Sequence, residues 1–245
     1  MTSPDSTLDG LRASEQHLLR TVDSLAPEDW AEPSVLPGWT RAHVLAHLAL
    51  NAEGLAGAVD GCARELVVPM YESAERRAAD IEDLAQADPA EIRERVFAAG
   101  QALREALGLL DQDQWSRGFP RVRDGGMVAL TSVPSMRRRE VEIHHADLLA
   151  GYRPSAWPAD FRTELLDVVT VDHAGSPDSP AFAVHASDLG RTWTVGADDP
   201  VVEGSGADLG WWLVGRGSGQ GLTCTTGDLP RLGPWRRTSA PTRET

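Results

Sequence analysis

The chain has 245 residues, more than the usual length of one domain, which favours two domains. Hydrophobic residues make up 41% of it, enough for a core, and the formal net charge of −14 argues against binding to nucleic-acid backbones. The start has no apolar leader, and no apolar run reaches about 18 residues, so we expect a cytoplasmic protein. Cys62 and Cys224 form no C-x-x-C pair, which argues against a disulfide framework or a thiolate zinc site.

The first half of the chain has the hydrophobic periodicity of helices. Residues 5 to 7 offer N-caps to a first helix, whose apolar residues recur at helical spacing as far as Leu25. Prolines and a glycine interrupt this periodicity over residues 27 to 39, which predicts a loop. Thr40 is placed to cap a second helix.

Further helices follow in this half. The polar segment from Glu72 to Leu84 predicts one of them. Asp88 begins a stronger signal, with proline at the next position and glutamate three residues after the cap, so we expect a helix from there to about Leu110. Residues 111 to 126 are predicted to form a loop. Long helices joined by loops indicate a bundle of about four core helices.

Residues 135 to 149, SMRRREVEIHHADLL, predict the last helix of this bundle, which Gly151 ends. Leu148 and Leu149 favour a buried side, whereas the arginines at 137 to 139 favour water. We therefore expect an amphipathic helix with these arginines in solvent.

The pattern changes beyond this helix. Two prolines and a glycine near Tyr152 predict a boundary between residues 1–152 and residues 153–245. In the second part, alternating residues predict a hairpin, and further strands and two helices surround it. The expected helices cover residues 161–171 and 207–215, and the expected strands cover 181–186, 191–195, 201–203 and 222–226. The fold class is therefore α+β with two domains.

Three side chains of the predicted bundle have metal-binding chemistry. Glu140 and His144 lie four residues apart, so they share one helix face, and an inward-facing glutamate needs a partner to offset its desolvation. His47 lies in an apolar stretch of the second helix with small neighbours. Two imidazoles and one carboxylate suit a divalent cation such as zinc, and three protein ligands leave one position for water or substrate.

Other interpretations fit the same spacing. With His43 as a fourth ligand, the metal site would be closed and structural. Single histidines on apolar helix faces are more often hydrogen-bonded core residues than ligands. Asp147 is either solvated or orients a ligand imidazole. Arg216 is either an ordinary charge at a helix C-terminus or a clamp for an anion.

Four more polar residues have no predicted role in chemistry. His145 lies about 100° around the helix from His144, so we expect it at the surface or behind a ligand. Tyr71, Arg76 and Arg77 are expected to be packing and surface residues rather than substrate contacts, in a segment that we expect to face the site.

Three segments have the order and spacing of a known family. They are residues 37–40 with 45–49, PGWT and LAHLA; residues 139–148, REVEIHHADL; and residues 211–216, WWLVGR. They resemble the mycothiol-dependent maleylpyruvate isomerase family. The resemblance implies a DinB-like four-helix bundle followed by a small α+β domain similar to sterol-carrier domains. It implies His47, Glu140 and His144 as metal ligands and Arg216 as a residue needed for activity, and it leaves His43 out of the ligand set.

The resemblance also implies an activity, the isomerisation of maleylpyruvate to fumarylpyruvate in aromatic (gentisate) degradation. Its cofactors would be Zn²⁺ or another divalent metal, and mycothiol, whose thiolate adds to the cis double bond and leaves again. Metal coordination deprotonates a thiol near neutral pH. Arg216 would bind a substrate carboxylate or the charge on an enediolate oxygen.

Two alternatives to the isomerase are a mycothiol S-transferase that acts on electrophiles, and a non-catalytic metal-binding module. In each case we expect a monomer that binds small molecules, including a low-molecular-weight thiol in the two enzymes. We expect it to bind neither nucleic acid nor a membrane.

Overall fold

The computed structural model describes residues 4–123, 125–177, 179–233 and 235, with the backbone alone for residues 4–6. The chain forms two compact units, which divide between Gly151 and Tyr152. The predicted division lies one residue later. No helix in the described residues is long and apolar enough to cross a membrane.

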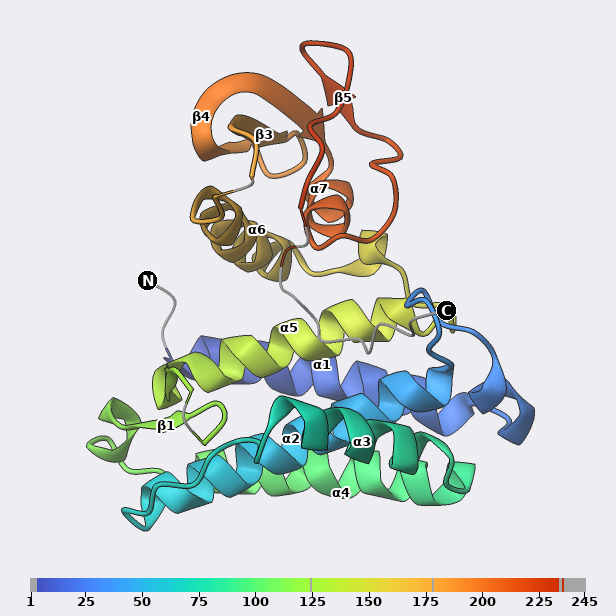
Figure 1. The fold of residues 1–245 in the computed structure, drawn as a ribbon, viewed down its shortest axis with the longest axis vertical. Coiled ribbons are helices and arrows are strands. Elements are labelled where there is room, and N and C mark those ends of the chain that lie inside the picture. The colour runs from blue at the N-terminus through green and yellow to red at the C-terminus, as the bar shows by residue number, and fades with distance from the viewer. Residues whose placement is uncertain (1–3, 124, 178, 234, 236–245) are drawn as a thin grey trace. The chain divides into compact units, whose positions relative to one another are not determined.

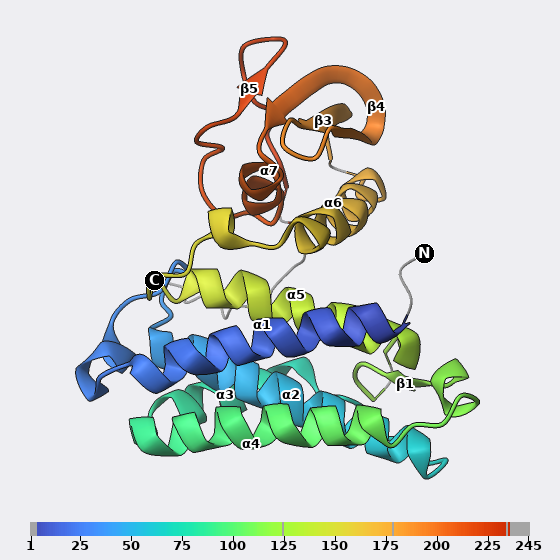
Figure 2. The same cartoon turned by 180° about the vertical axis from the view of Figure 1, so that it is seen from behind.

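The first unit is a helical bundle (Figures 1 and 2). Its long helices, among the described residues, are α1 (Pro4–Ser24), α2 (Arg41–Ala63), α4 (Pro89–Gly108) and α5 (Val133–Asp147). Helix α1 packs against α5 and α4, and α2 packs against α4 and α5. The shorter α3 (Ala74–Ala85) lies against α2. The predicted four-helix bundle is confirmed.

Local capping signals set the starts of two helices. Thr40 Oγ1 accepts a hydrogen bond from the His43 N–H, and His43 Nδ1 accepts one from the Thr40 N–H. Asp88 accepts a hydrogen bond from the Ala90 N–H at the start of α4, with Pro89 at the first helical position. Each contact pairs a backbone donor that the helix leaves unpaired, so both predicted starts are confirmed.

The residues predicted to cap the start of α1 do not lie before it. Thr7 lies inside α1, because the helix already includes Pro4, so its prediction as a cap is wrong. The side chains of Asp5 and Ser6 lie outside the described part of the chain.

The segment predicted as a loop over residues 111 to 126 contains secondary structure. Its 3₁₀ turn, Gln114–Ser116, is followed by β1 (Gly118–Pro120), which pairs antiparallel with β2 (Met127–Ala129). Strands this short carry no readable alternation of polar and apolar residues. Gly118 allows the close approach, since a Cβ there would lie 2.6 Å from the Val128 carbonyl oxygen.

The consecutive arginines at 137 to 139 are buried, so the prediction that they lie in solvent is wrong. Arg137 is only 1% exposed. Its Nη1 donates to the Leu48 carbonyl and to Asn51 Oδ1, both at 2.9 Å, and its Nε donates to Glu15 at 3.3 Å. A buried charge is tolerated when it is paired and hydrogen-bonded. Glu15, which interrupts the apolar stripe of α1, is therefore the counter-charge of α5.

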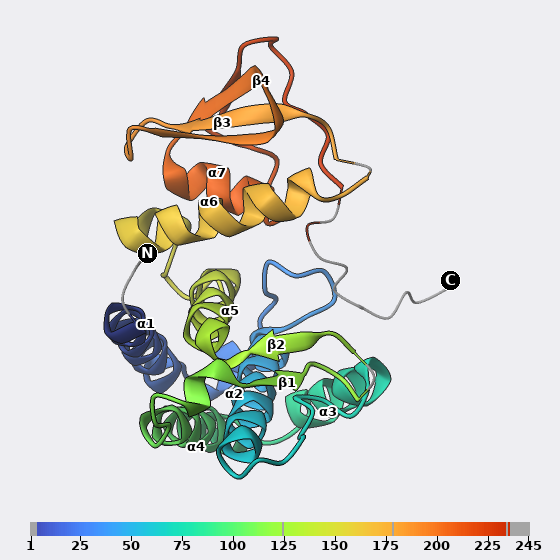
Figure 3. The ribbon, with the colours of Figure 1, turned by 90° about the vertical axis from the view of Figure 1, so that its left-hand side faces the viewer.

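The second unit is a small sheet with two helices on one side (Figure 3). Its elements are the 3₁₀ turn Pro154–Ala156, α6 (Ala159–Ala174), β3 (Phe182–Ala186), β4 (Arg191–Gly204), α7 (Gly206–Leu213) and β5 (Thr223–Cys224). Buried aromatic side chains form its core, and they include Trp157 after the 3₁₀ turn, Phe161 on α6, Phe182 on β3 and Trp212 on α7. The predicted α+β class is confirmed.

One long strand supplies both neighbours of β3. The first half of β4 pairs with β3 in antiparallel register, down to Ala186 opposite Arg191, which is the predicted hairpin. The second half pairs with β3 in parallel register, up to Ala186 opposite Gly204. The strand predicted over residues 201–203 is therefore the continuation of β4, and β5 pairs antiparallel with it.

Candidate metal centre

Side chains from α2 and α5 converge inside the bundle. His47 Nε2 lies 2.9 Å from Glu140 Oε2, and His144 Nε2 lies 3.4 Å from the same oxygen. One donor atom from each of the three residues lies within 4.8 Å of the other two. The spacing of four residues places Glu140 and His144 on one face of α5, and the packing of α2 against α5 brings His47 to them.

The donor set fits a divalent metal. Ligand atoms about 2.0 to 2.1 Å from a tetrahedral zinc ion lie about 3.3 to 3.4 Å from one another. The distance from His144 to Glu140 already has this value. The distance from His47 to Glu140 is that of a hydrogen bond and would need to lengthen by about half an ångström.

Burial and mutual contacts set the charges of the donors. Burial lowers the pKa of His47 to about 4, so this imidazole is neutral at neutral pH. Burial raises the pKa of Glu140, but its hydrogen bonds with His144 and His47 outweigh this effect and hold the pKa well below its ordinary value. Burial lowers the pKa of His144, but hydrogen bonds with Asp147 and Glu140 outweigh it and raise the pKa overall. A metal would therefore displace a proton from His144 below that raised pKa.

Asp147 forms a hydrogen bond with the ring nitrogen of His144 that does not face Glu140. Its carboxylate is fully buried and accepts a hydrogen bond from His144 Nδ1 at 2.8 Å. This contact places the proton on Nδ1 and directs Nε2 toward Glu140. Carboxylates in this position orient ligand imidazoles in metal sites. Of the two roles considered for Asp147, the geometry supports the orientation of an imidazole.

Asp147→Asn is expected to weaken metal binding by about 10-fold to 100-fold, because a neutral amide holds the imidazole less firmly and makes it less basic. Competition for Zn²⁺ with a chromophoric chelator measures the change. Asp113→Asn, at an exposed position of the same unit, is the matched control and is expected to bind like the wild type. Equal affinities in all three proteins would contradict the assigned role of Asp147.

His47, Glu140 and His144 are called the triad below. His145 is buried and contacts α1 instead of the triad, so the expectation that it lies at the surface or behind a ligand is wrong. Its Nε2 lies 2.8 Å from Thr21 Oγ1, and its ring meets His17 edge to face. It is 1% exposed. The neighbouring histidines of α5 therefore serve two different interfaces.

The stability of the protein is expected to fall with acid because of His145. Burial lowers its pKa to about 3 in the folded state, against 6.5 ordinarily. Below pH 6.5 the unfolded chain binds a proton that the folded chain does not, so the free energy of unfolding decreases by up to about 1.4 kcal/mol per pH unit as the pH falls toward 3. Urea titrations of wild type and His145→Gln should show a shallower decrease in the variant. Identical slopes would refute the contribution of His145.

His43 is not part of the cluster that the described residues form. Its Nδ1 lies 2.8 Å from Thr40 Oγ1, and its Nε2 lies 3.3 Å from Glu82 Oε2. Both ring nitrogens therefore have other partners. The geometry does not support the closed four-ligand alternative.

Arg77 reaches the triad, although the sequence predicted a packing or surface role. Its Nη2 lies 3.0 Å from His47 Nδ1, and its guanidinium lies over the ring of Tyr71, 5.3 Å from the centroid. No motif marks this contact, because Arg77 lies 30 residues from His47 on a different helix.

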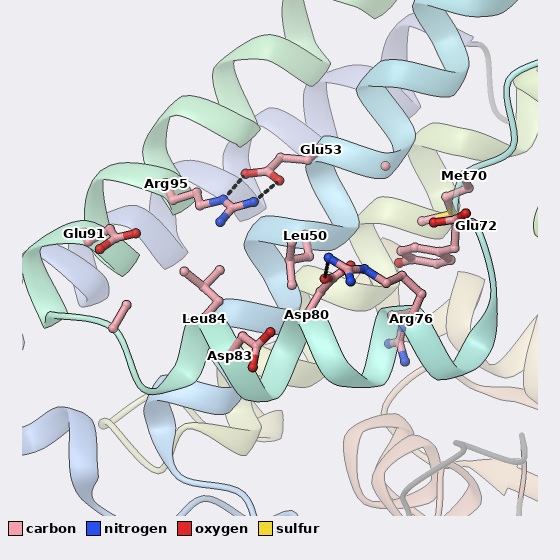
Figure 4. Close-up of a pocket in the computed structure, with 14 residues that line it drawn as sticks. Leu50, Glu53, Met70, Glu72, Arg76, Asp80, Asp83, Leu84, Glu91 and Arg95 are labelled. Carbon is pink, nitrogen blue, oxygen red and sulfur yellow. Dashed lines mark hydrogen bonds and ion pairs between the residues drawn. The ribbon is translucent and has the colours of Figure 1, made fainter.

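A cavity of about 600 Å³ lies beside Arg77, between α2, α3 and α4 (Figure 4). Two ion pairs lie in its wall, Arg95 with Glu53 at 2.6 and 2.9 Å, and Arg76 with Asp80 at 2.8 Å. Arg77 and Tyr71 also line it. The cavity is thus connected to the triad through the Arg77 side chain.

Arg216 lies in the second unit, just after α7. Gly215, with φ of 77°, turns the chain there, and Arg216 Nη1 donates to the Val214 carbonyl at 3.0 Å. Its role in activity stays a prediction.

Two family models match the chain. Residues 11–149 match the mycothiol maleylpyruvate isomerase N-terminal domain, and residues 156–234 match the C-terminal domain of the same family. The chain belongs to the mycothiol maleylpyruvate isomerase family. The resemblance stated from the sequence motifs is therefore confirmed.

Solved structures agree with this family. A crystal structure of the mycothiol-dependent maleylpyruvate isomerase is similar with a TM-score of 0.88 and 27% identity, over 96% of this chain and 98% of the other. A crystal structure of a histidine-to-alanine mutant of the isomerase has the same TM-score and coverage, at 26% identity. No curated protein matches the chain.

Proposed function

We propose that this family member isomerises maleylpyruvate to fumarylpyruvate with mycothiol and a divalent metal. The observation that carries the proposal is the convergence of His47, Glu140 and His144 within the bundle. Membership of the family and the similarity to a mycothiol-dependent maleylpyruvate isomerase support the choice of substrate and thiol.

His47, Glu140 and His144 would hold a metal such as Zn²⁺ and leave one coordination position open. When bound, such a metal supplies a Lewis acid that lowers the pKa of a thiol at that position. The protein itself holds the three donor atoms close together and in charge states that can bind a metal. Asp147 orients His144, and the Glu140 carboxylate offsets part of the positive charge of the metal.

The isomerisation requires the cis C=C bond to become single for long enough to rotate. Mycothiol, when bound, supplies the nucleophile whose addition and departure allow this. Arg216 would bind a carboxylate of the substrate, or the negative oxygen that develops during addition, because a guanidinium binds such groups with two parallel hydrogen bonds. In this proposal residues 1–152 form the metal-binding domain, and residues 153–245 form the domain that carries Arg216.

Metal analysis and turnover test the proposal together. The purified protein is expected to hold a divalent metal in close to stoichiometric amount and to consume maleylpyruvate only when mycothiol is added. Removal of the metal with a chelator is expected to stop turnover, and Zn²⁺ is expected to restore it. A metal-loaded protein that leaves maleylpyruvate unchanged would refute the isomerase. Conjugation of a model electrophile to mycothiol in the same assay would then identify an S-transferase.

A further inference from the structure

The Nδ1 atoms of the two triad imidazoles face different hydrogen-bonding partners, an acceptor at His144 and a donor at His47. His144 Nδ1 faces the carboxylate of Asp147, which only accepts hydrogen bonds when ionised. His47 Nδ1 faces the guanidinium of Arg77, which only donates. The proton of neutral His144 therefore lies on Nδ1, whereas the proton of neutral His47 lies on Nε2.

The proton on His47 Nε2 explains the short distance to Glu140. It points at Glu140 Oε2, 2.9 Å away, as a hydrogen bond requires. His144 Nε2 lies farther from the same oxygen, at 3.4 Å; it donates a hydrogen bond there when the ring is protonated and carries a lone pair when the ring is neutral. Of the two neutral imidazoles, His144 alone is in the tautomer that binds a metal through Nε2.

A metal at the triad requires the other tautomer of His47. Its Nε2 must lose the proton to become a ligand, and the neutral ring then carries the proton on Nδ1. An N–H at Nδ1 would face the N–H of Arg77, and two donors cannot share a hydrogen bond. We propose that Arg77 and the metal compete for His47, so that metal binding releases the Arg77 guanidinium from the triad. This inference rests on the metal site proposed above.

In the structure the Arg77 guanidinium lies at the triad, where it donates to His47 Nδ1 and lies over the Tyr71 ring. Its Nε is buried and has no hydrogen-bond partner among the described residues, which is unfavourable for a donor.

Arg77 also lines the cavity, whose wall carries more carboxylates than guanidinium groups. The carboxylates on the wall are Glu53, Glu72, Asp80, Asp83 and Glu91. A released guanidinium would therefore lie in a cavity whose wall carries carboxylates, two of them, Asp80 and Asp83, on its own helix α3.

Zinc affinity tests the competition. Arg77→Met keeps an apolar stem of similar length and removes the donor, so it is expected to bind Zn²⁺ about tenfold more tightly than the wild type, or tighter still. Arg76→Met removes the neighbouring arginine, which is exposed and paired with Asp80, and is expected to leave the affinity unchanged. Competition with a chelator at neutral pH gives the affinities of all three full-length proteins. Equal or weaker binding by Arg77→Met would overturn the competition.

Nitrogen-15 NMR of the imidazoles gives a second test on the wild-type chain. Above the raised pKa of His144, we expect the metal-free protein to have the His47 proton on Nε2 and the His144 proton on Nδ1. Addition of Zn²⁺ is expected to move the His47 proton to Nδ1. A metal-free spectrum with the His47 proton already on Nδ1 would overturn the inference. Zinc binding by neither wild type nor Arg77→Met refutes the metal site itself, whereas equal binding by both refutes the competition alone.

Discussion

His144→Ala is expected to lose its metal and its isomerase activity together. The change removes one of the three donors, and the two that remain, His47 and Glu140, come from different helices. Loss of an outer partner of a ligand already costs about 10-fold to 100-fold in metal affinity, so loss of the ligand itself should cost more than about 100-fold. Metal analysis after dialysis and turnover of maleylpyruvate with mycothiol measure the two losses. Full metal content in the variant would refute the assignment of His144.

His43→Ala is the matched control for this experiment. His43 is also a buried histidine of the bundle, but its ring contacts Thr40 and Glu82. The variant is expected to keep its metal and its turnover. It should lose about 1 kcal/mol of stability, because the backbone N–H of Thr40 loses its acceptor at the start of α2. Alanine favours helices, so neither histidine variant should disturb its own helix otherwise.

Arg216→Ala is expected to keep its metal and lose most of its turnover. All three proposed ligands lie in the first unit, so metal binding does not require a residue of the second unit. Loss of a group that stabilises developing negative charge lowers kcat by about 10²-fold to 10³-fold. Arg216→Lys is expected to recover only part of the rate, since an ammonium keeps the charge without the planar pair of donors.

Arg231→Ala controls for the loss of a positive charge in the same unit. Arg231 is exposed and lies outside the helices and strands of that unit. Its variant should retain both metal and turnover. Full activity of Arg216→Ala, with the metal in place, would remove Arg216 from the mechanism.

Local sequence signals were enough to predict the starts of two helices of the bundle, α2 and α4. The start of α2 follows from Thr40, and the start of α4 follows from Asp88 with the proline after it, because capping depends on residues within one turn. The shared face of Glu140 and His144 follows from helical geometry alone. The approach of His47 to Glu140 depends on the packing of α2 against α5. Residue types and spacing showed that the three side chains could meet, but not that the two helices pack together.

Contacts between distant segments could not be predicted in the same way. The burial of Arg137 depends on Glu15, which lies 122 residues earlier. The burial of His145 depends on Thr21, which lies 124 residues earlier. A buried charge and a solvated charge look alike in the sequence, since only the partner distinguishes them. For the same reason the contact of Arg77 with His47 was not predicted, although its segment was expected to face the site.

The hydrogen bonds of Arg137 affect the direction in which the triad side chains of α5 point. Arg137 lies on the same face of α5 as Glu140 and His144, one and two turns before them. Apolar packing is not directional, so by itself it allows a helix to rotate slightly about its axis. The Arg137 guanidinium forms directional hydrogen bonds with α1 and α2, and these oppose such a rotation of α5. The rotation of α5 about its axis, and with it the direction of Glu140 and His144, is thus fixed by a side chain whose hydrogen bonds go to α1 and α2.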